Sequence, residues 1–219
     1  ALGSKTNFYQ IPGLEEHAFQ LKELEDSERL RAHTERMFAM ASTETSYHRR
    51  KELLRFVIGG GGLTGVELAA EMVERFDRLS AQYHIDPSDP EMLLLELSES
   101  ILPTLEGRQV VRSVEALQAM GIRILTGTRV MGMEERDGRL LVLREPGDPI
   151  PSRTMVWTGG IRISDLLRKS GAETGPQGRV VVNRHLQMKD YPEVFAIGDN
   201  AFAFDPDTDK AVPLSLIHI

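Results

Sequence analysis

The 219-residue chain contains no cysteine, which excludes disulfide bonds, thiolate nucleophiles, CxxC redox pairs and cysteine metal sites. Basic residues are in deficit. The 26 Lys and Arg against 33 Asp and Glu give a formal net charge of −7, so no basic field attracts nucleic acid or anionic lipid. We therefore expect no nucleic-acid partner, and the lack of cysteine is compatible with a cytoplasmic location.

Long apolar runs are also missing. No stretch approaches the roughly 18 continuous apolar residues that a membrane-spanning helix needs, and residues 1–10 lack the basic-then-apolar layout of a signal peptide. The six histidines show no HxxH, HxxxH or HExxH spacing, so the sequence predicts no metal site. Its 41% hydrophobic and 27% charged residues are ordinary for a globular protein that buries a core.

Apolar periodicity predicts alternating strands and helices. Because strands that alternate with helices form parallel sheets with helices on both faces, we expect an α/β, Rossmann-like fold. The dipeptide Asp137-Gly138 between two β-rich segments predicts an antiparallel β-hairpin insert. The expected strands are 53–58, 92–97, 122–125, 129–136, 139–144, 154–158, 180–182 and 194–197, and the expected helices are 25–41, 64–79 and 108–120.

The sharpest motif is a GxGxxG sequence, residues 60–65, directly after a predicted strand and opening a predicted helix. Gly60 would allow the tight turn, Gly62 would let a pyrophosphate approach the backbone, and Gly65 would permit close packing of helix on strand. The helix N-terminus would attract the phosphates. The alternative is a glycine-rich turn without a ligand, but the strand–turn–helix context favours a site for NAD(H).

A dinucleotide site of this kind needs an acidic residue at the end of the second strand to bind the adenosine ribose. Glu96 stands at that position, although its distance from Gly65 exceeds the usual ~20 residues, and Glu99 is a nearby competitor. A carboxylate there repels a 2′-phosphate, which favours NAD over NADP. The alternative is a solvated carboxylate at a strand end.

Glu67 follows Gly65 by two residues, in the first turn of the predicted helix. A carboxylate is unfavourable beside a bound pyrophosphate, so Glu67 would instead reach the nicotinamide end of the ligand. A first-turn acid that stabilises the helix dipole is an equally good interpretation. The residues alone leave both interpretations open.

Four segments together resemble type II NADH dehydrogenases, members of the two-dinucleotide-binding flavoproteins, the pyridine nucleotide-disulfide oxidoreductase superfamily. Residues 56–69 (FVIGGGGLTGVELA) resemble the family's NADH-binding segment, and residues 1–14 its crossing segment from the flavin domain. Residues 156–161 (VWTGGI) are similar to its tryptophan-containing strand end. Residues 194–199 (VFAIGD) match the second flavin motif.

The resemblance implies that NADH passes hydride to FAD and that the reduced flavin passes electrons to a membrane quinone. On that basis the NADH pyrophosphate is held by the glycine turn, the adenosine ribose by Glu96, and the nicotinamide half lies near Gly160 and Glu67. Gly3 and Asp199 would contact the flavin. The implied NAD(H)-binding residues of the turn are Gly60, Gly62, Leu63, Thr64 and Gly65.

The family's upstream FAD fingerprint and its C-terminal quinone and membrane region have no counterpart in the sequence. We therefore expect a truncated enzyme, inactive alone and with FAD bound weakly or not at all. The expected parts are a partial FAD-domain segment and crossover helix (1–50), an NAD(H)-binding domain (51–171) and a second partial FAD-domain segment (172–219). Residues 214–219 do not continue the family pattern, which favours their interpretation as a cloning or assembly artefact. Full-length relatives would be peripheral proteins on the cytoplasmic face of the membrane, in contact with it through the missing C-terminal region.

Two alternatives stay open. One is a free-standing NAD-binding sensor module, against which the flavin-type Gly198-Asp199 motif argues. The other is a different flavoprotein reductase with a protein acceptor. The sequence does not distinguish a protein acceptor from a quinone, because the acceptor site lies outside these residues. An FAD fingerprint upstream would exclude the sensor.

Overall fold

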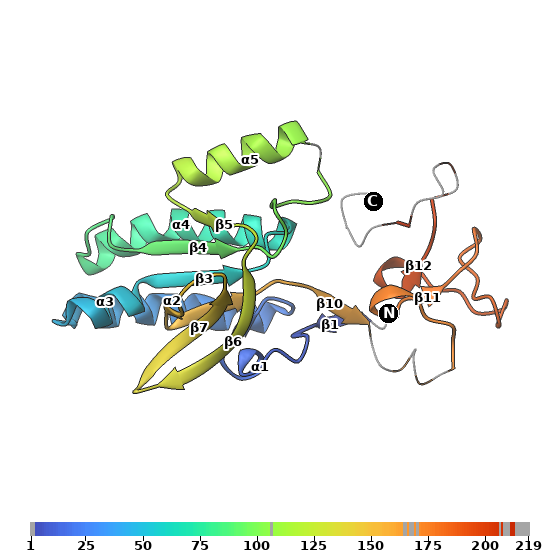
Figure 1. Cartoon of the computed structure of the whole chain (residues 1–219), viewed down its shortest axis with the longest axis horizontal. Helices are drawn as coiled ribbons and strands as arrows, with labels where there is room; N and C mark the ends of the chain where they lie inside the picture. Colours follow the sequence, from blue (N-terminus) through green and yellow to red (C-terminus); the bar gives the residue numbers. More distant parts are fainter. Residues whose placement is uncertain are drawn as a thin grey trace. The chain divides into compact units, whose positions relative to one another are not determined.

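The computed structural model describes residues 3–105, 107–163, 166, 169, 171–205, 207 and 211–212. The chain divides into two compact units. One comprises residues 8–159, and the other comprises residues 1–7 together with 160–219. Figure 1 follows the chain through both.

A five-stranded parallel sheet forms the centre of the larger unit. Its strand order is β2 (Phe19–Gln20), β9 (Thr154–Trp157), β3 (Arg55–Gly59), β4 (Glu91–Leu95) and β5 (Arg123–Leu125). All neighbours are parallel, so the carboxyl ends of the strands meet at one edge. The chain proceeds from β3 outward to β4 and β5, then returns to the other side of β3 with β9. This reversal is the kind of switch point at which open α/β sheets bind ligands.

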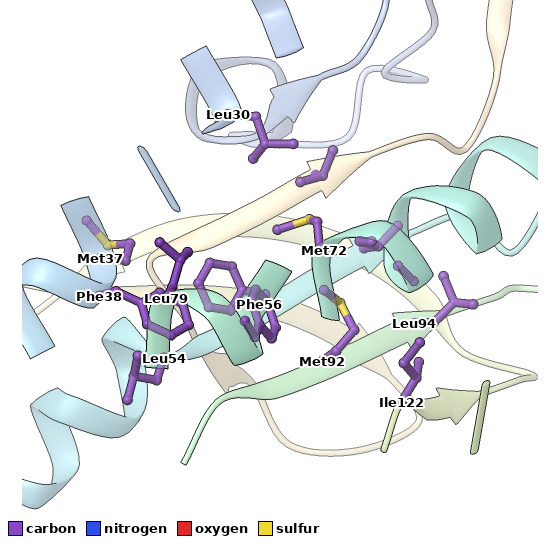
Figure 2. Packing of buried hydrophobic residues seen from close by; sticks show 14 of the residues in the cluster. Leu30, Met37, Phe38, Leu54, Phe56, Met72, Leu79, Met92, Leu94 and Ile122 are labelled. Atoms are coloured by element: carbon purple, nitrogen blue, oxygen red, sulfur yellow. The ribbon is translucent and has the colours of Figure 1, made fainter. Parts of the chain in front are cut away.

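One face of this sheet is covered by the three long helices, α2 (Leu24–Thr43), α4 (Leu63–Tyr83) and α5 (Gly107–Ala119). The ring of Phe56 lies 4.6 Å from that of Phe76 on α4 and 6.1 Å from that of Phe38 on α2, measured between centroids. Figure 2 shows how this cluster joins the helices to strands β3 and β4. Burial of these side chains is the main driving force for this layer.

The opposite face is covered differently. Val57, next to Phe56 on β3, points the other way and packs in a second cluster with Leu14 of α1 (Leu14–His17) and Val142 of β7. This layer is a three-stranded antiparallel sheet of β6 (Arg129–Arg136), β7 (Arg139–Glu145) and β8 (Ile150–Pro151). The α/β parallel sheet is therefore confirmed, but among the described residues the second face is covered by the antiparallel sheet and the four-residue α1.

The predicted hairpin is confirmed in register. Arg136 pairs with Arg139 across Asp137 and Gly138, whose φ angles are 53° and 71°. Two successive positive φ values define the type I′ turn that suits the twist of a hairpin.

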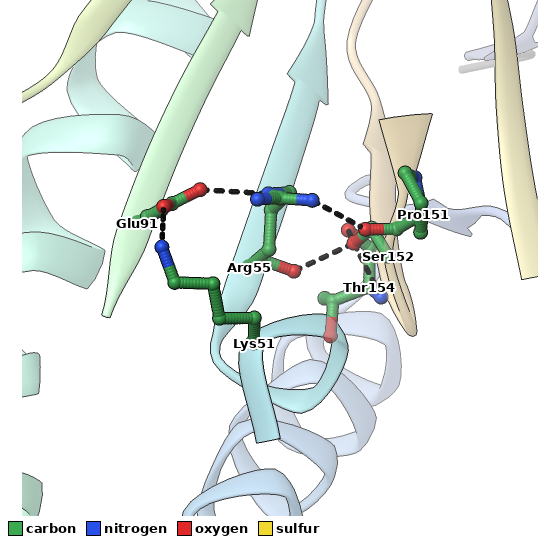
Figure 3. Close-up of polar contacts among 6 residues, drawn as sticks. All are labelled: Lys51, Arg55, Glu91, Pro151, Ser152 and Thr154. Atoms are coloured by element: carbon green, nitrogen blue, oxygen red, sulfur yellow. Dashed lines mark hydrogen bonds and ion pairs between the residues drawn. The ribbon is translucent and has the colours of Figure 1, made fainter. Parts of the chain in front are cut away.

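The amino ends of the strands are joined by a polar network that follows α3 (Tyr47–Leu53), a helix absent from the sequence-based prediction (Figure 3). The Glu91 carboxylate accepts from Arg55 Nε at 2.7 Å and pairs with Lys51 Nζ at 3.4 Å. Ser152 Oγ donates to the Arg55 carbonyl at 2.6 Å. Burial opposes ionisation of Glu91, but the Arg55 hydrogen bond and the two positive charges hold its pKa below the usual value. The network thus aligns β3, β4 and β9.

The smaller unit has two short strand pairs. The first is the antiparallel pair β1 (Ser4–Thr6) and β10 (Ile161–Ile163). The second is the parallel pair β11 (Val180–Val181) and β12 (Ala201–Phe202), accompanied by the 3-10 helices η1 (Pro176–Gly178) and η2 (Gly198–Asn200).

The expected strand at 194–197 is wrong. Among the described residues this segment has one isolated bridge, between Gln187 and Phe195, in place of a ladder. Phe195 and Ile197 are 61% and 68% exposed. Apolar β-formers favour an extended backbone, and Val194 and Ala196 do bond to the backbone of Met188 and Leu186, but a ladder needs successive bridges and this pairing stops after one.

The two units do not follow the predicted boundaries at 50/51 and 171/172. Residues 8–50 pack with the parallel sheet, because α2 contributes Leu30, Met37 and Phe38 to its core. Which segments act as nucleotide and flavin domains stays a prediction. The 214–219 tail lies outside the described residues.

Candidate functional site

The glycine turn, residues 59–62, joins β3 to α4 at the carboxyl edge of the parallel sheet. It is held by backbone bonds before any ligand arrives: Gly60 N donates to the Leu95 carbonyl at 2.8 Å, and the Gly61 carbonyl accepts from Leu102 N at 2.8 Å. Gly60 has φ = +114°, a backbone conformation that residues with a side chain rarely adopt. The sequence folds here as a tight turn because glycine tolerates that angle.

Helix α4 begins without a side-chain cap from any described residue, and its N-cap is Gly62. A Cβ built on Gly62 would meet no atom within 4 Å. The first-turn N–H groups of Leu63, Thr64 and Gly65 have no intrahelical acceptor and carry the positive end of the helix dipole. The open space before them suits an anionic group such as a pyrophosphate.

Gly65 has the opposite surroundings. A Cβ there would lie 1.9 Å from the Gly60 carbonyl oxygen and 2.7 Å from Thr158 Oγ1. Only glycine allows α4 to approach the turn this closely. This is the packing role expected of the last glycine of the motif.

Glu96 follows β4 and faces the turn. Its Oε2 accepts from Gly61 N at 2.6 Å and its Oε1 from Ser98 N at 2.7 Å. Each carboxylate oxygen thus holds one backbone N–H and keeps further lone pairs for a ligand hydroxyl. Its competitor Glu99 is exposed and does not line the cleft described next.

A cleft of about 600 Å³ opens at this edge, at the ends of β3, β4 and β9. Its opposite wall comes from the segment before α1 and from the start of β6. Trp157 is 8% exposed and packs in the core below the cleft. The lining residues are Tyr9, Gln10, Ile11, Pro12, Gly60, Leu95, Glu96, Leu97, Ser98, Thr128, Arg129, Val130, Met131, Trp157 and Gly159.

Of the predicted NAD(H) residues, Gly60 and Glu96 line the cleft, and Gly62 to Gly65 continue from it into α4. Glu67 lies exposed on the first turns of α4 and is not part of the lining. Its contact with the nicotinamide stays a prediction.

The smaller unit holds the predicted flavin contacts Gly3 and Asp199. Ser4 Oγ lies 3.5 Å from Asp199 Oδ2, and a Cβ built on Gly3 or on Gly198 would meet open space. Gly160, also in this unit, accepts from Asn7 N at 3.0 Å through its carbonyl.

Two buried polar atoms of the smaller unit, Arg179 Nε and Asn200 Oδ1, have no hydrogen-bond partner among the residues that the structure describes. Burial lowers the pKa of Arg179, and the charge of Asp199 opposes that shift. Because buried polar atoms normally find partners, this arrangement fits a polar ligand beside Asp199.

Two residues that contribute to these sites were not among the residues predicted from the sequence. Thr158 Oγ1 reaches the carbonyls of Gly59 and Gly60, and Arg179 accompanies Asp199. The position of Thr158 at the carboxyl end of a strand was an available signal, since such ends meet at the ligand edge of a parallel sheet.

Within the part of the chain that the structure describes, no helix is both long and apolar enough to cross a membrane. The same residues include no group of three or more His, Asp or Glu placed to hold a metal ion.

Residues 1–214 match the family model described as pyridine nucleotide-disulphide oxidoreductase. Among curated relatives, a probable NADH dehydrogenase of Dictyostelium discoideum is 34% identical over 203 residues, covering 91% of this chain and 44% of the relative. A type II NADH:quinone oxidoreductase of Staphylococcus epidermidis is 28% identical, with coverage of 97% and 52%. The chain thus spans about half the length of the curated relatives it matches.

Solved structures agree on the fold. NDH2 from Plasmodium falciparum in complex with NADH superimposes with a TM-score of 0.79 at 21% identity, covering 91% of this chain and 42% of that one. A ferredoxin reductase from Rhodopseudomonas palustris gives a TM-score of 0.71 at 18% identity, covering 95% and 45%. Taken with the glycine turn and its uncapped helix, these matches show that the chain belongs to the pyridine nucleotide-disulphide oxidoreductase family of enzymes and is similar to its type II NADH:quinone oxidoreductases.

Proposed function

We propose that this chain is the NADH-binding portion of an NADH:quinone oxidoreductase. The observation that carries the proposal is the open space before the uncapped N-terminus of α4, where a Cβ on Gly62 would meet nothing, beside the anchored carboxylate of Glu96. The N–H groups would bind the pyrophosphate and Glu96 the adenosine ribose. The name of the Plasmodium structure, a complex with NADH, supports the same ligand.

In the longer protein, NADH would supply hydride to a bound FAD, and a quinone would take the electrons at the membrane. Gly3, Asp199 and the neighbouring Arg179 and Asn200 would hold part of the flavin, since two of their buried polar atoms lack partners among the described residues. We expect the chain itself not to turn over, because it spans about half of its curated relatives.

A free-standing nucleotide sensor is the weaker hypothesis. It gives no purpose to Asp199 or to the unpartnered buried atoms beside it. A flavoprotein reductase with a protein acceptor stays an alternative for the longer protein, and the ferredoxin reductase match is compatible with it at the level of fold.

The test is a calorimetric titration of the purified chain with NADH and NADPH, together with its visible spectrum. We expect NADH binding in a colourless sample and affinity for NADPH at least about tenfold lower, because the 2′-phosphate would face the Glu96 carboxylate. Glu96→Ala should narrow that gap and weaken both ligands, because it also releases the N–H groups of Gly61 and Ser98. Absence of binding by either nucleotide would refute the proposal, and a yellow, flavin-loaded sample would refute the expectation that FAD binds weakly.

A further inference from the structure

We propose that the hydroxyl of Thr158 is a positioning group that holds the glycine turn in its ligand-binding shape and thereby sets the affinity for the pyrophosphate. The inference rests on the proposed function, because it assumes that the turn binds a dinucleotide. Thr158 lies outside the GxGxxG sequence and was not among the predicted ligand contacts, although it belongs to the 156–161 segment. It follows β9, on the far side of β3 from Glu96.

The contacts of Thr158 reach two successive carbonyl groups of the turn. Its Oγ1 lies 3.1 Å from the Gly59 oxygen and 3.0 Å from the Gly60 oxygen, so the hydroxyl proton is shared between them. Its backbone N also donates to the Gly59 oxygen, at 2.8 Å. Strand β9 therefore holds the carbonyl side of the turn.

The N–H groups of the turn are held by β4, the strand on the other side of β3. Gly60 N donates to Leu95 and Gly61 N to Glu96, both at the end of β4. The carbonyl and the following N–H of one peptide plane point in opposite directions. Drawing the Gly60 oxygen toward Thr158 thus turns the N–H of Gly61 toward Glu96. The two residues act on the same peptide from opposite sides.

This peptide needs such support because Gly60 adopts φ = +114° and glycine is flexible. Gly65 supplies the room: the missing Cβ would lie 2.7 Å from Thr158 Oγ1. A turn that is already ordered spares the ligand the entropic cost of ordering it. It also keeps carbonyl oxygens directed away from the incoming phosphates, which their partial negative charge would repel.

The experiment compares Thr158→Val with wild type in the 219-residue chain, using NADH, ADP and adenosine as probes. Valine keeps the shape of the side chain and removes the hydroxyl. We expect NADH and ADP to bind about five- to tenfold more weakly, as for the loss of one hydrogen bond, and adenosine, which has no phosphate, to change by less than about twofold. Thr158→Ser, which retains the hydroxyl, should bind like wild type.

Thr34→Val is the matched control. Thr34 is buried, and its hydroxyl donates to the Leu30 carbonyl at 2.8 Å within α2, outside the cleft. It should leave all three affinities unchanged.

Three results would overturn the inference: unchanged ADP affinity in Thr158→Val, an equal loss for adenosine, or a Thr158→Ser variant as weak as Thr158→Val. If Thr158→Val fails to fold, the ADP affinity of Thr158→Ser decides. Weak ADP binding by Thr158→Ser would mean that the hydroxyl does not set the affinity. Wild-type chain that binds neither NADH nor ADP would refute the proposed function, and the inference with it, whatever the variants do.

Discussion

Gly62 and Gly65 stand three residues apart in one motif, yet a side chain on each would meet different surroundings. At Gly62 it would enter open space, with φ = −73°, which any residue adopts. At Gly65 it would collide with the Gly60 backbone at 1.9 Å. One glycine leaves room for a ligand and the other leaves room for the protein itself.

This difference predicts that Gly62→Ala and Gly65→Ala separate binding from stability. Gly62→Ala should keep the thermal midpoint of wild type and lose most NADH affinity, because its methyl group occupies the phosphate space. Gly65→Ala should lose binding and also about 1–3 kcal/mol of unfolding free energy through overpacking. Thermal unfolding and calorimetry of both variants check this, and equal destabilisation of the two would contradict it.

His33 provides a second prediction, on pH. Its ring, on α2, lies 2.9 Å from Thr154 Oγ1 on β9, and burial together with the charge of Arg36 lowers its pKa from 6.5 to about 4. The unfolded chain therefore binds a proton below about pH 6.5 that the folded chain refuses until about pH 4. The free energy of unfolding should fall across that window as pH drops.

For this one group the loss should be roughly 2–3 kcal/mol between pH 7 and pH 4, after allowance for partial exposure. Denaturant unfolding measured against pH for wild type and for His33→Gln, whose amide does not titrate, separates the contribution of His33 from that of the other titrating groups. Parallel pH profiles for the two proteins would show that His33 does not contribute.

At the scale of elements, the hairpin between β6 and β7 was predicted from two residues because its turn is local. The turn needs positive φ at two successive residues, and Asp137 and Gly138 tolerate it whatever the rest of the chain does. The segment 194–197 shows the opposite case. Its apolar β-formers predict a strand, but its pairing with residues 186–188 stops after one bridge, and no local pattern records how far a pairing continues.

Gly138→Ala should therefore destabilise the protein through the backbone alone. A Cβ there meets no atom within 4 Å, so the cost is that of a left-handed alanine, about 1 kcal/mol. NADH affinity should not change, because the turn does not line the cleft. Chemical denaturation measures the first effect and calorimetry the second, and a loss of affinity would show that the hairpin is coupled to the glycine turn.

At the scale of the whole molecule, the parallel sheet, its helices, the antiparallel layer and the cleft all belong to residues 8–159. The predicted flavin contacts Gly3 and Asp199 belong to the other unit. The division thus separates Gly60 and Glu96 from the expected flavin contacts, whereas Gly160, predicted to lie near the nicotinamide half, belongs to the smaller unit.

Residues 8–159 alone should fold cooperatively and bind NADH within about threefold of the whole chain, since both the hydrophobic clusters of the sheet and the cleft are retained. Circular dichroism and calorimetry on this shortened chain test the prediction. A shortened chain that folds without binding would mean that the smaller unit contributes to the NADH site.

The sequence by itself determined the features that depend on neighbours along the chain. These are the strand–turn–helix around Gly60 to Gly65, the helical faces, the Asp137-Gly138 hairpin and the acid at the end of β4. Each follows from backbone freedom or from a short hydrophobic period. Only the tertiary structure decided that an antiparallel sheet covers the second face, that α2 packs on the parallel sheet, and that Glu96 and Thr158 hold one peptide from opposite sides. Those outcomes depend on which strands become neighbours, and strand order joins residues about a hundred positions apart, which no local pattern records.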